Sequence, residues 1–181
     1  ALQLVLGAGD LGAALVQQAF DGVVFTGSTE VAKLIEKRIA QADNDPVLIA
    51  ETGGQNVLVS DSSALPEQVV ADVLSSAFDS AGQRCSALRI LLLQEDVADH
   101  YYKMITEAIN EFSLGDPRLL STDIGPVIDQ EAKQNLENHK ANMRKVARAY
   151  VELEAPTNGH FVAPAVYLLD NLNQLQREVF G

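Results

Sequence analysis

The chain has 181 residues, 47% hydrophobic and 21% charged, and its 13 basic against 25 acidic side chains give a formal net charge of −12. Such an acidic balance argues against nucleic acid or an anionic membrane surface as the main partner. No apolar run approaches the roughly 18–20 residues of a membrane span and the single cysteine cannot form an internal disulfide, so we expect a soluble, cytoplasmic chain.

The first fifty residues alternate between strand and helix patterns. Strands are predicted at residues 2–6, 23–26 and 47–50, where short apolar runs end in turn residues. Helices are predicted to begin at Asp10, as an N-cap, and at Ser28 or Thr29. Strand and helix in such short succession predict parallel βαβ units and therefore an α/β sheet.

The remaining chain continues the alternation. Further strands are predicted at residues 56–59, 88–93 and 161–167, and helices at 66–78, 97–112 and 130–150, with Gly82 ending the first of these helices. Gly53-Gly54 falls between two complete βα blocks and is the best candidate for a domain boundary. We therefore expect an α/β chain covering parts of two domains, residues 1–52 and 53–181.

Two glycine-containing turns are candidates for phosphate binding. Gly7-x-Gly9-x-x-Gly12 follows a predicted strand and precedes a helix, as a dinucleotide fingerprint does, but the next strand lacks the acidic residue that would bind a ribose. Thr26-Gly27-Ser28-Thr29 offers free N–H groups and hydroxyls at a second strand-to-helix junction. Both turns also fit an ordinary structural role, in tight packing or helix capping.

Cys85 and Glu51 are the two candidate reactive side chains. Cys85 lies just beyond the predicted helix end at Gly82, among polar neighbours, although a lone cysteine is commonly a small buried hydrophobe. Arg84 would favour a thiolate there only if its side chain turned toward the sulfur. Glu51 ends a predicted parallel strand, where α/β sheets bind ligands, but a solvated loop carboxylate has the same pattern.

Four motifs, in order along the chain, resemble those of the NAD(P)-dependent aldehyde dehydrogenase superfamily. They are FTGSTEVA (residues 25–32), ETGGQN (51–56), GQRC (82–85) and EVFG (178–181). The 34 positions between Glu51 and Cys85 also match the family's spacing. CSALR (85–89) and NGHFVAP (158–164) are similar to the branch that oxidises L-glutamate γ-semialdehyde, above all to the dehydrogenase part of bacterial bifunctional proline-utilisation proteins.

The resemblance implies a three-layer α/β/α fold and a role for each matching residue. Cys85 would be the nucleophile and Glu51 the general base that activates water. Ser86 would help to bind the substrate carboxylate, and no metal would take part. The cofactor would contact the residues Thr26, Gly27, Ser28, Glu178 and Phe180. Ala32 stands where many members have a third glycine, a change of one methyl group that leaves the preceding turn intact.

The resemblance also implies a cofactor and a larger setting. Residues 1–52 would be the C-terminal part of an NAD-binding domain, and residues 53–181 a truncated catalytic domain. The substrate would be a small aldehyde oxidised with NAD, and the parent polypeptide would form homo-oligomers and carry FAD in a separate proline dehydrogenase domain. Alone, the 181-residue chain would bind NAD poorly and turn over little.

Four other interpretations stay open. A different substrate branch, or a catalytically silent dinucleotide-binding module with a structural Cys85, would share the same motifs. A CoA-dependent acylating relative would also form a thioester, but a water-activating Glu51 would work against it. A metal enzyme is the weakest alternative, because the histidines at positions 100, 139 and 160 lack metal-ligand spacing.

Overall fold

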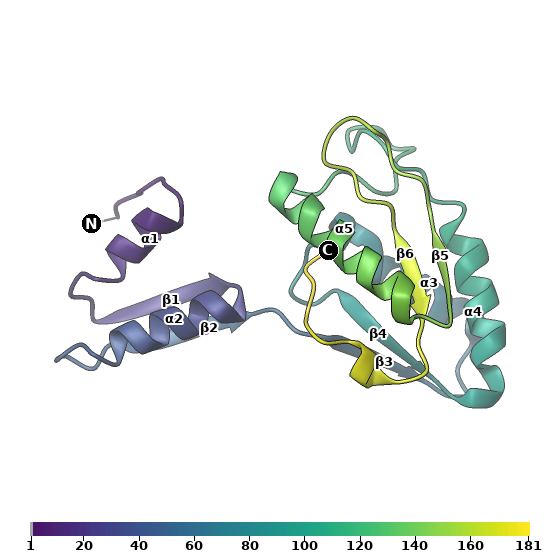
Figure 1. The fold of residues 1–181 in the computed structure, drawn as a ribbon, viewed down its shortest axis with the longest axis horizontal. Helices are drawn as coiled ribbons and strands as arrows, with labels where there is room; N and C mark the ends of the chain where they lie inside the picture. Colours follow the sequence, from purple (N-terminus) through teal and green to yellow (C-terminus); the bar gives the residue numbers. More distant parts are fainter. Residues whose placement is uncertain (1) are drawn as a thin grey trace. The chain divides into compact units, whose positions relative to one another are not determined.

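The computed structural model describes residues 2–181, which form two compact units (Figure 1). Unit 1 extends to Gly53 and unit 2 comprises Gly54–Gly181. Among the described residues, none of the helices combines the length and the apolar character that crossing a membrane requires.

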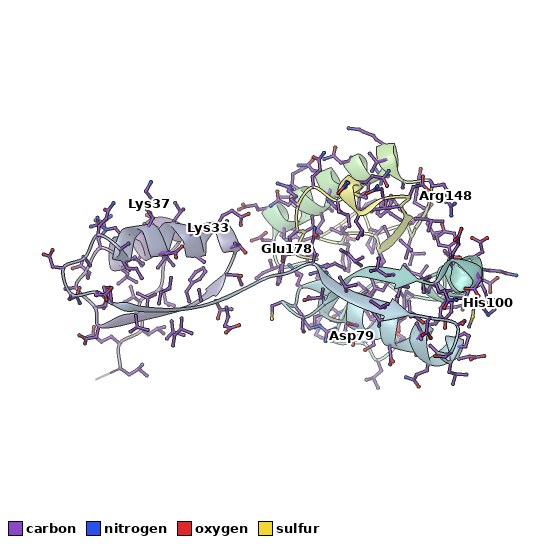
Figure 2. All side chains as sticks on the ribbon, turned by 90° about the horizontal axis from the view of Figure 1, so that it is seen from below. Lys33, Lys37, Asp79, His100, Arg148 and Glu178 are labelled. Carbon is purple, nitrogen blue, oxygen red and sulfur yellow. The ribbon has the colours of Figure 1, made fainter. Side chains whose placement is uncertain are left out.

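Unit 1 is built around two parallel strands. Its elements in order are α1 (Gly9–Leu15), β1 (Gly22–Gly27), α2 (Thr29–Ile39) and β2 (Val47–Thr52). The strands pair in parallel, and α2 forms the crossover between them. Helix α2 buries Ala32 and Ile35, whereas Lys33 and Lys37 lie on the side of the helix that faces away from the strands (Figure 2). This amphipathic pattern is what places one face of the helix on the sheet.

The predicted N-terminal strand at residues 2–6 is wrong. These residues form no strand although they lie within the described part of the chain, and Leu2 and Leu4 are exposed. An apolar run becomes a strand only where another strand offers hydrogen bonds, and none of the described residues pairs with it. Helix α1 begins after Ala8, so Asp10 lies in its first turn and is not the N-cap.

Unit 2 contains a parallel pair and an antiparallel pair of strands. Its elements in order are β3 (Asn56–Ser60), α3 (Pro66–Phe78), the 3₁₀ helix η1 (Asp79–Gly82), β4 (Leu88–Leu93), α4 (Glu95–Ile109), α5 (Gln130–Val146), β5 (Ala149–Glu152), β6 (Ala165–Leu168) and the 3₁₀ helix η2 (Leu172–Gln174). Strands β3 and β4 are parallel, with α3 between them in sequence. The core joins α3, β4 and α4 through the residues Val70, Val73, Leu88, Tyr101 and Ile105.

The C-terminal part of unit 2 departs from the sequence prediction. Helix α5 ends at Val146, and β5 follows where the polar pattern predicted helix up to residue 150. The predicted strand at 161–167 is observed as β6, which is shorter and pairs antiparallel with β5. A short strand such as β5 is specified by its partner and not by local periodicity, so the pattern did not reveal it.

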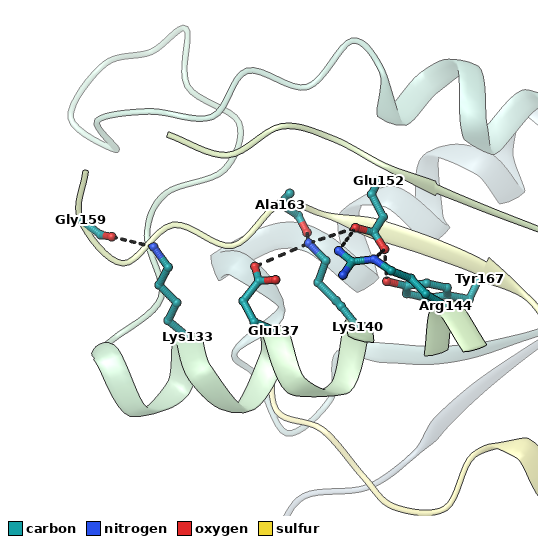
Figure 3. Close-up of polar contacts among 8 residues, drawn as sticks. All are labelled: Lys133, Glu137, Lys140, Arg144, Glu152, Gly159, Ala163 and Tyr167. Carbon is teal, nitrogen blue, oxygen red and sulfur yellow. Dashed lines mark hydrogen bonds and ion pairs between the residues drawn. The ribbon is translucent and has the colours of Figure 1, made fainter. Parts of the chain in front are cut away.

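A polar network joins α5 to the β5–β6 pair (Figure 3). The buried Lys140 ammonium donates to the Ala163 carbonyl at 3.0 Å and lies 3.5 Å from the Glu152 carboxylate. Arg144 and the Tyr167 hydroxyl also donate to Glu152. Burial raises the pKa of Glu152, but these donors and the Lys140 charge outweigh it and hold that pKa below its usual value. Burial and the same carboxylate raise the pKa of Tyr167, which keeps its hydroxyl protonated.

Substituting Glu152→Gln in the full-length protein is expected to lower the opening free energy of α5 amides at pH 7 by about 3 kcal/mol, since it removes the more buried of the two carboxylates that pair with the buried Lys140. Because the pKa of Glu152 is below its unfolded value of 4.5, its contribution is present above about pH 4.5 and is lost as the pH falls through the folded-state value.

Amide hydrogen exchange across pH 3–7 measures both effects. The control is Glu137→Gln, because Glu137 also pairs with Lys140, at 3.7 Å, but is more exposed; its cost should stay within about 1 kcal/mol. Equal effects of the two substitutions would contradict a dominant role for Glu152.

Candidate functional site

In unit 1, the carboxyl ends of two neighbouring strands bring Thr26 and Glu51 together. They are register partners on β1 and β2, so they occupy adjacent positions at one end of the sheet. Both are exposed. In an open α/β sheet this end of the strands is where ligands bind, and a carboxylate there is accessible to water and substrate.

The turn from β1 into α2 is shaped to receive an anionic group. Ser28 is the N-cap, and its Oγ accepts the Val31 N–H at 3.2 Å. The other N–H groups of the first helical turn have no intrahelical acceptor and point out of the helix end. A Cβ on Gly27 would lie 2.5 Å from the tip of the Phe25 ring, so a larger residue there would require that ring to move. These groups suit a phosphate of a dinucleotide.

The two remaining features of the unit 1 motifs are now clear. Ala32 is buried, and its N–H donates to the Ser28 carbonyl at 3.0 Å, so the methyl group leaves the turn regular. The Gly7-x-Gly9-x-x-Gly12 trio precedes a helix of seven residues, and no strand leads into it among the described residues. The trio therefore lacks the strand that a dinucleotide fingerprint requires.

In unit 2, Cys85 lies exposed in the loop between η1 and β4. The chain leaves α3 through two residues in the left-handed region, Ser80 at φ 58° and Ala81 at φ 54°. Gly82 follows at φ 68°, where a Cβ would come within 2.9 Å of the Ala77 carbonyl oxygen. The loop thus turns sharply away from the helix, and Cys85 is exposed two residues before the chain enters the core at Ala87.

The side chain of Arg84 binds the end of α3. Its Nη2 donates to the carbonyl oxygens of Ser75 and Ser76 at 2.9 and 3.2 Å. The Ser75 carbonyl also accepts the backbone N–H of Asp79, the C-cap of α3, and the Ser76 carbonyl belongs to the last helical turn, where carbonyls lack intrahelical donors. The guanidinium therefore caps the negative end of the helix. The sequence left open whether the Arg84 side chain turns toward the Cys85 sulfur, and the structure shows that it binds the helix end.

Two side chains hold the Cys85 loop by its backbone oxygens. Nδ2 of Asn56, at the start of β3, donates to the carbonyls of Cys85 and Ala87 at 2.8 and 2.9 Å. Nη2 of Arg89, on β4, donates to the Gly82 carbonyl at 2.7 Å. The structure thus fixes the loop at both ends.

Arg89 also links this loop to the C-terminal segment, residues 178–181. Its Nη1 donates to the Gly181 oxygen at 3.2 Å. Burial lowers the pKa of Arg89, an effect that the negative charge of Glu178 opposes and the positive charge of Arg84 reinforces. The segment that carries two of the predicted cofactor contacts is therefore tied to the loop that carries the predicted nucleophile.

Alternate residues of the C-terminal segment line a cavity. Val179 and Gly181 line an apolar cavity of about 470 Å³ inside unit 2. Glu178, labelled in Figure 2, is half-buried, and Phe180 is 49% exposed. Such alternation is that of an extended segment. It leaves Phe180 accessible to a ligand.

Within unit 1, the structure brings together the predicted residues Thr26, Gly27, Ser28 and Glu51. Within unit 2, Cys85 and Ser86 are consecutive and exposed. Asn56 and Arg89 were not identified as site residues, although each had a signal: Asn56 ends the ETGGQN motif, and Arg89 is the only charge in the strand LRILLL. Residues 2–181 contain no group of three side chains arranged to bind a metal ion.

Comparison with known proteins adds two groups of relatives. Bifunctional protein PutA of Escherichia coli K12 is 51% identical over 194 aligned residues, which cover 99% of this chain and 15% of that protein. The 1-pyrroline-5-carboxylate dehydrogenase of Bacillus cereus B4264 is 31% identical over 166 residues, 88% of this chain and 32% of that protein. The chain therefore spans between about a seventh and a third of the length of these relatives.

Solved structures agree with the sequence relatives. A Bradyrhizobium japonicum proline utilization A structure superposes with a TM-score of 0.93 at 52% identity, covering 97% of this chain and 18% of that one. Staphylococcus aureus betaine aldehyde dehydrogenase, solved with NAD⁺ and a BME-modified cysteine, gives 0.89 at 28% identity, covering 98% and 38%. These matches confirm the predicted fold class.

Residues 1–181 match the sequence model of the aldehyde dehydrogenase family. A match along the entire length, together with relatives and structures of the same kind, leads to one conclusion: the chain belongs to the aldehyde dehydrogenase family.

Proposed function

We propose that the chain supplies the nucleophile, the general base and part of the cofactor site of an NAD-dependent dehydrogenase that oxidises L-glutamate γ-semialdehyde to L-glutamate. The observation that carries the proposal is the exposed Cys85 in a loop held by its backbone, within a chain of the aldehyde dehydrogenase family. An exposed cysteine in such a loop is available to a substrate, unlike a structural cysteine in a core.

In the proposed reaction, the Cys85 thiolate adds to the aldehyde carbon and the carbonyl π electrons move to oxygen, giving a tetrahedral oxyanion. The Cys85 N–H donates no hydrogen bond to any of the described residues, so it is available to this oxyanion. When the oxyanion collapses, the carbon–hydrogen bond breaks, a hydride leaves, and a thioester remains on Cys85.

NAD supplies the hydride acceptor when bound. The β1–α2 turn fits its phosphates, because Gly27 and the first turn of α2 present backbone N–H groups and a helix N-terminus to an anion. Glu178 would bind the nicotinamide ribose and Phe180 would contact the ring region. The family resemblance and the NAD⁺ of the betaine aldehyde dehydrogenase support this assignment.

Glu51 then takes a proton from water, the water oxygen attacks the thioester, and the carbon–sulfur bond breaks to release the acid and the thiolate. Its exposure at the end of β2 keeps the carboxylate in contact with water.

The choice of substrate rests on the relatives. The PutA proteins and the 1-pyrroline-5-carboxylate dehydrogenases are named for proline utilisation and for a pyrroline carboxylate. The γ-semialdehyde is the open-chain form of that compound, and Ser86, next to the nucleophile, would bind its carboxylate. The low coverage of these relatives supports a longer parent polypeptide, and the family resemblance implies that this parent would be an oligomeric, cytoplasmic protein with an FAD-dependent proline dehydrogenase domain.

Replacing Cys85 by Ala in the full-length protein is expected to lower NADH formation from glutamate γ-semialdehyde at least 10³-fold, a loss of roughly 4 kcal/mol of transition-state stabilisation. The assay compares the semialdehyde with a simple aliphatic aldehyde in both proteins. Preference for the simple aldehyde in the unmodified protein would contradict the substrate, and NADH formation that survives in the variant would contradict the covalent mechanism.

Glu51→Gln is expected to leave the first hydride transfer intact and to slow thioester hydrolysis by about 10²–10⁴-fold. Rapid-mixing absorbance should then show a burst of one NADH per site followed by slow turnover. Glu36→Gln, which replaces an exposed carboxylate further along α2, is the matched control and should behave as the unmodified protein. Absence of a burst would place Glu51 in an earlier step.

Ser86→Ala is expected to raise the KM for the semialdehyde about tenfold, the value of one hydrogen bond to a charged group at roughly 1.5 kcal/mol. The KM for an aliphatic aldehyde without a carboxylate should stay the same, because that substrate has no group for Ser86 to bind. Steady-state kinetics with the two aldehydes separates these cases, and an equal change for both would refute the role in specificity.

A further inference from the structure

Asn56 has no role in the chemistry described above, yet it makes two of the contacts that define the Cys85 loop. We propose that Asn56 is a positioning residue for Cys85 and that Arg89 assists it from the opposite end of the loop. The inference rests on the proposed function only in taking Cys85 as the nucleophile.

The Asn56 amide uses a single nitrogen to bind two carbonyls. Its hydrogen bonds to Cys85 and Ala87, at 2.8 and 2.9 Å, are both of ordinary good length. The two hydrogens of an amide nitrogen lie in one plane at a fixed angle. Each carbonyl is therefore held in its direction relative to the other, and the intervening Ser86 is held between them.

Asn56 itself is anchored. It is half-buried at the first position of β3, paired in register with Leu88 of β4. The β3–β4 pair packs against the core of unit 2, in which Leu58 contacts the buried cluster and Leu88 belongs to it. The two hydrogen bonds from Asn56 therefore attach the loop, which has no regular secondary structure of its own, to the packed sheet.

Both peptide planes that flank Cys85 are fixed by this arrangement. The plane that follows Cys85 contains the carbonyl that Asn56 binds. The plane that precedes it contains the Arg84 carbonyl, which accepts the Ala87 N–H at 3.1 Å. That second plane also carries the Cys85 N–H, the proposed oxyanion donor, so its direction is set before substrate arrives. Preorganised donors of this kind are the ones that stabilise an oxyanion strongly.

Arg89 provides the second point of attachment. Its guanidinium binds the Gly82 carbonyl at 2.7 Å and the Gly181 oxygen at 3.2 Å. Gly82 lies three residues before Cys85, so the backbone is held by Arg89 before Cys85 and by Asn56 at and after it. Neither side chain has to touch substrate for the sulfur and the N–H to be held in place.

The test is Asn56→Leu in the full-length protein, since leucine keeps the approximate shape of asparagine and removes both donors without adding charge. We expect kcat to fall at least tenfold while the KM values for NAD and aldehyde change less than threefold. The second-order rate of Cys85 alkylation by iodoacetamide should also fall at least threefold. Asn138→Leu, at an exposed position on α5, is the matched control and should change neither.

The outcomes separate the positioning role from the proposed function. An Asn56→Leu protein with kcat and alkylation within threefold of the unmodified protein, or one altered only in KM, overturns the positioning role. If Cys85→Ala retains NADH formation, the proposed function fails, and the alkylation rate alone decides whether Asn56 positions the thiol.

A second variant covers the case in which Asn56→Leu does not fold, as judged by circular dichroism. Arg89→Lys keeps the charge but loses the two-pronged geometry that reaches both Gly82 and Gly181. It should lower kcat and the alkylation rate about threefold, again with little change in KM. Unchanged values of both would overturn the proposal in that case.

Discussion

Unit 2 is organised around a guanidinium placed on a strand that is otherwise apolar. Arg89 is half-buried, so its charge requires acceptors at short distance, and it finds them in the Gly82 and Gly181 oxygens. Gly82 lies in the loop that leads into β4, seven residues before Arg89, whereas Gly181 is 92 residues after it. Satisfying one buried charge therefore fixes the start of the Cys85 loop and the end of the C-terminal segment together. The sharp turn at Gly82, which leaves no room for a Cβ, is a consequence of how closely these segments meet.

In unit 1, strand pairing and a local helix cap position the corresponding residues. The parallel register of β1 and β2 sets Thr26 beside Glu51, and the Ser28 cap starts α2 directly after β1. A carboxylate and a helix N-terminus thus arise at one end of the sheet without any long-range side-chain contact. Under the proposed function, unit 1 would contribute the acid–base and anion-binding groups and unit 2 the thiol.

The features predicted correctly from the sequence are those that a local residue pattern determines. The Ser28 cap, the 66–78 helix and the parallel pairs follow from capping residues and periodicity, and the family motifs led to Cys85 and Glu51. The strand at residues 2–6 failed because its pairing partner is not specified by its own apolar pattern. The roles of Asn56 and Arg89 were not predicted for a related reason: both side chains bind backbone carbonyls. Every residue type has such a carbonyl, so the sequence does not indicate which residue accepts the hydrogen bond.

That last property has a consequence for divergence within the family. Every amino acid carries a carbonyl oxygen, so a loop held at the Gly82, Cys85 and Ala87 oxygens tolerates changes in the side chains between them. The exposed Ser86 side chain makes none of these contacts, so its exchange leaves them in place. Side chains on the loop can then change one at a time, while the position of the Cys85 backbone is inherited unchanged.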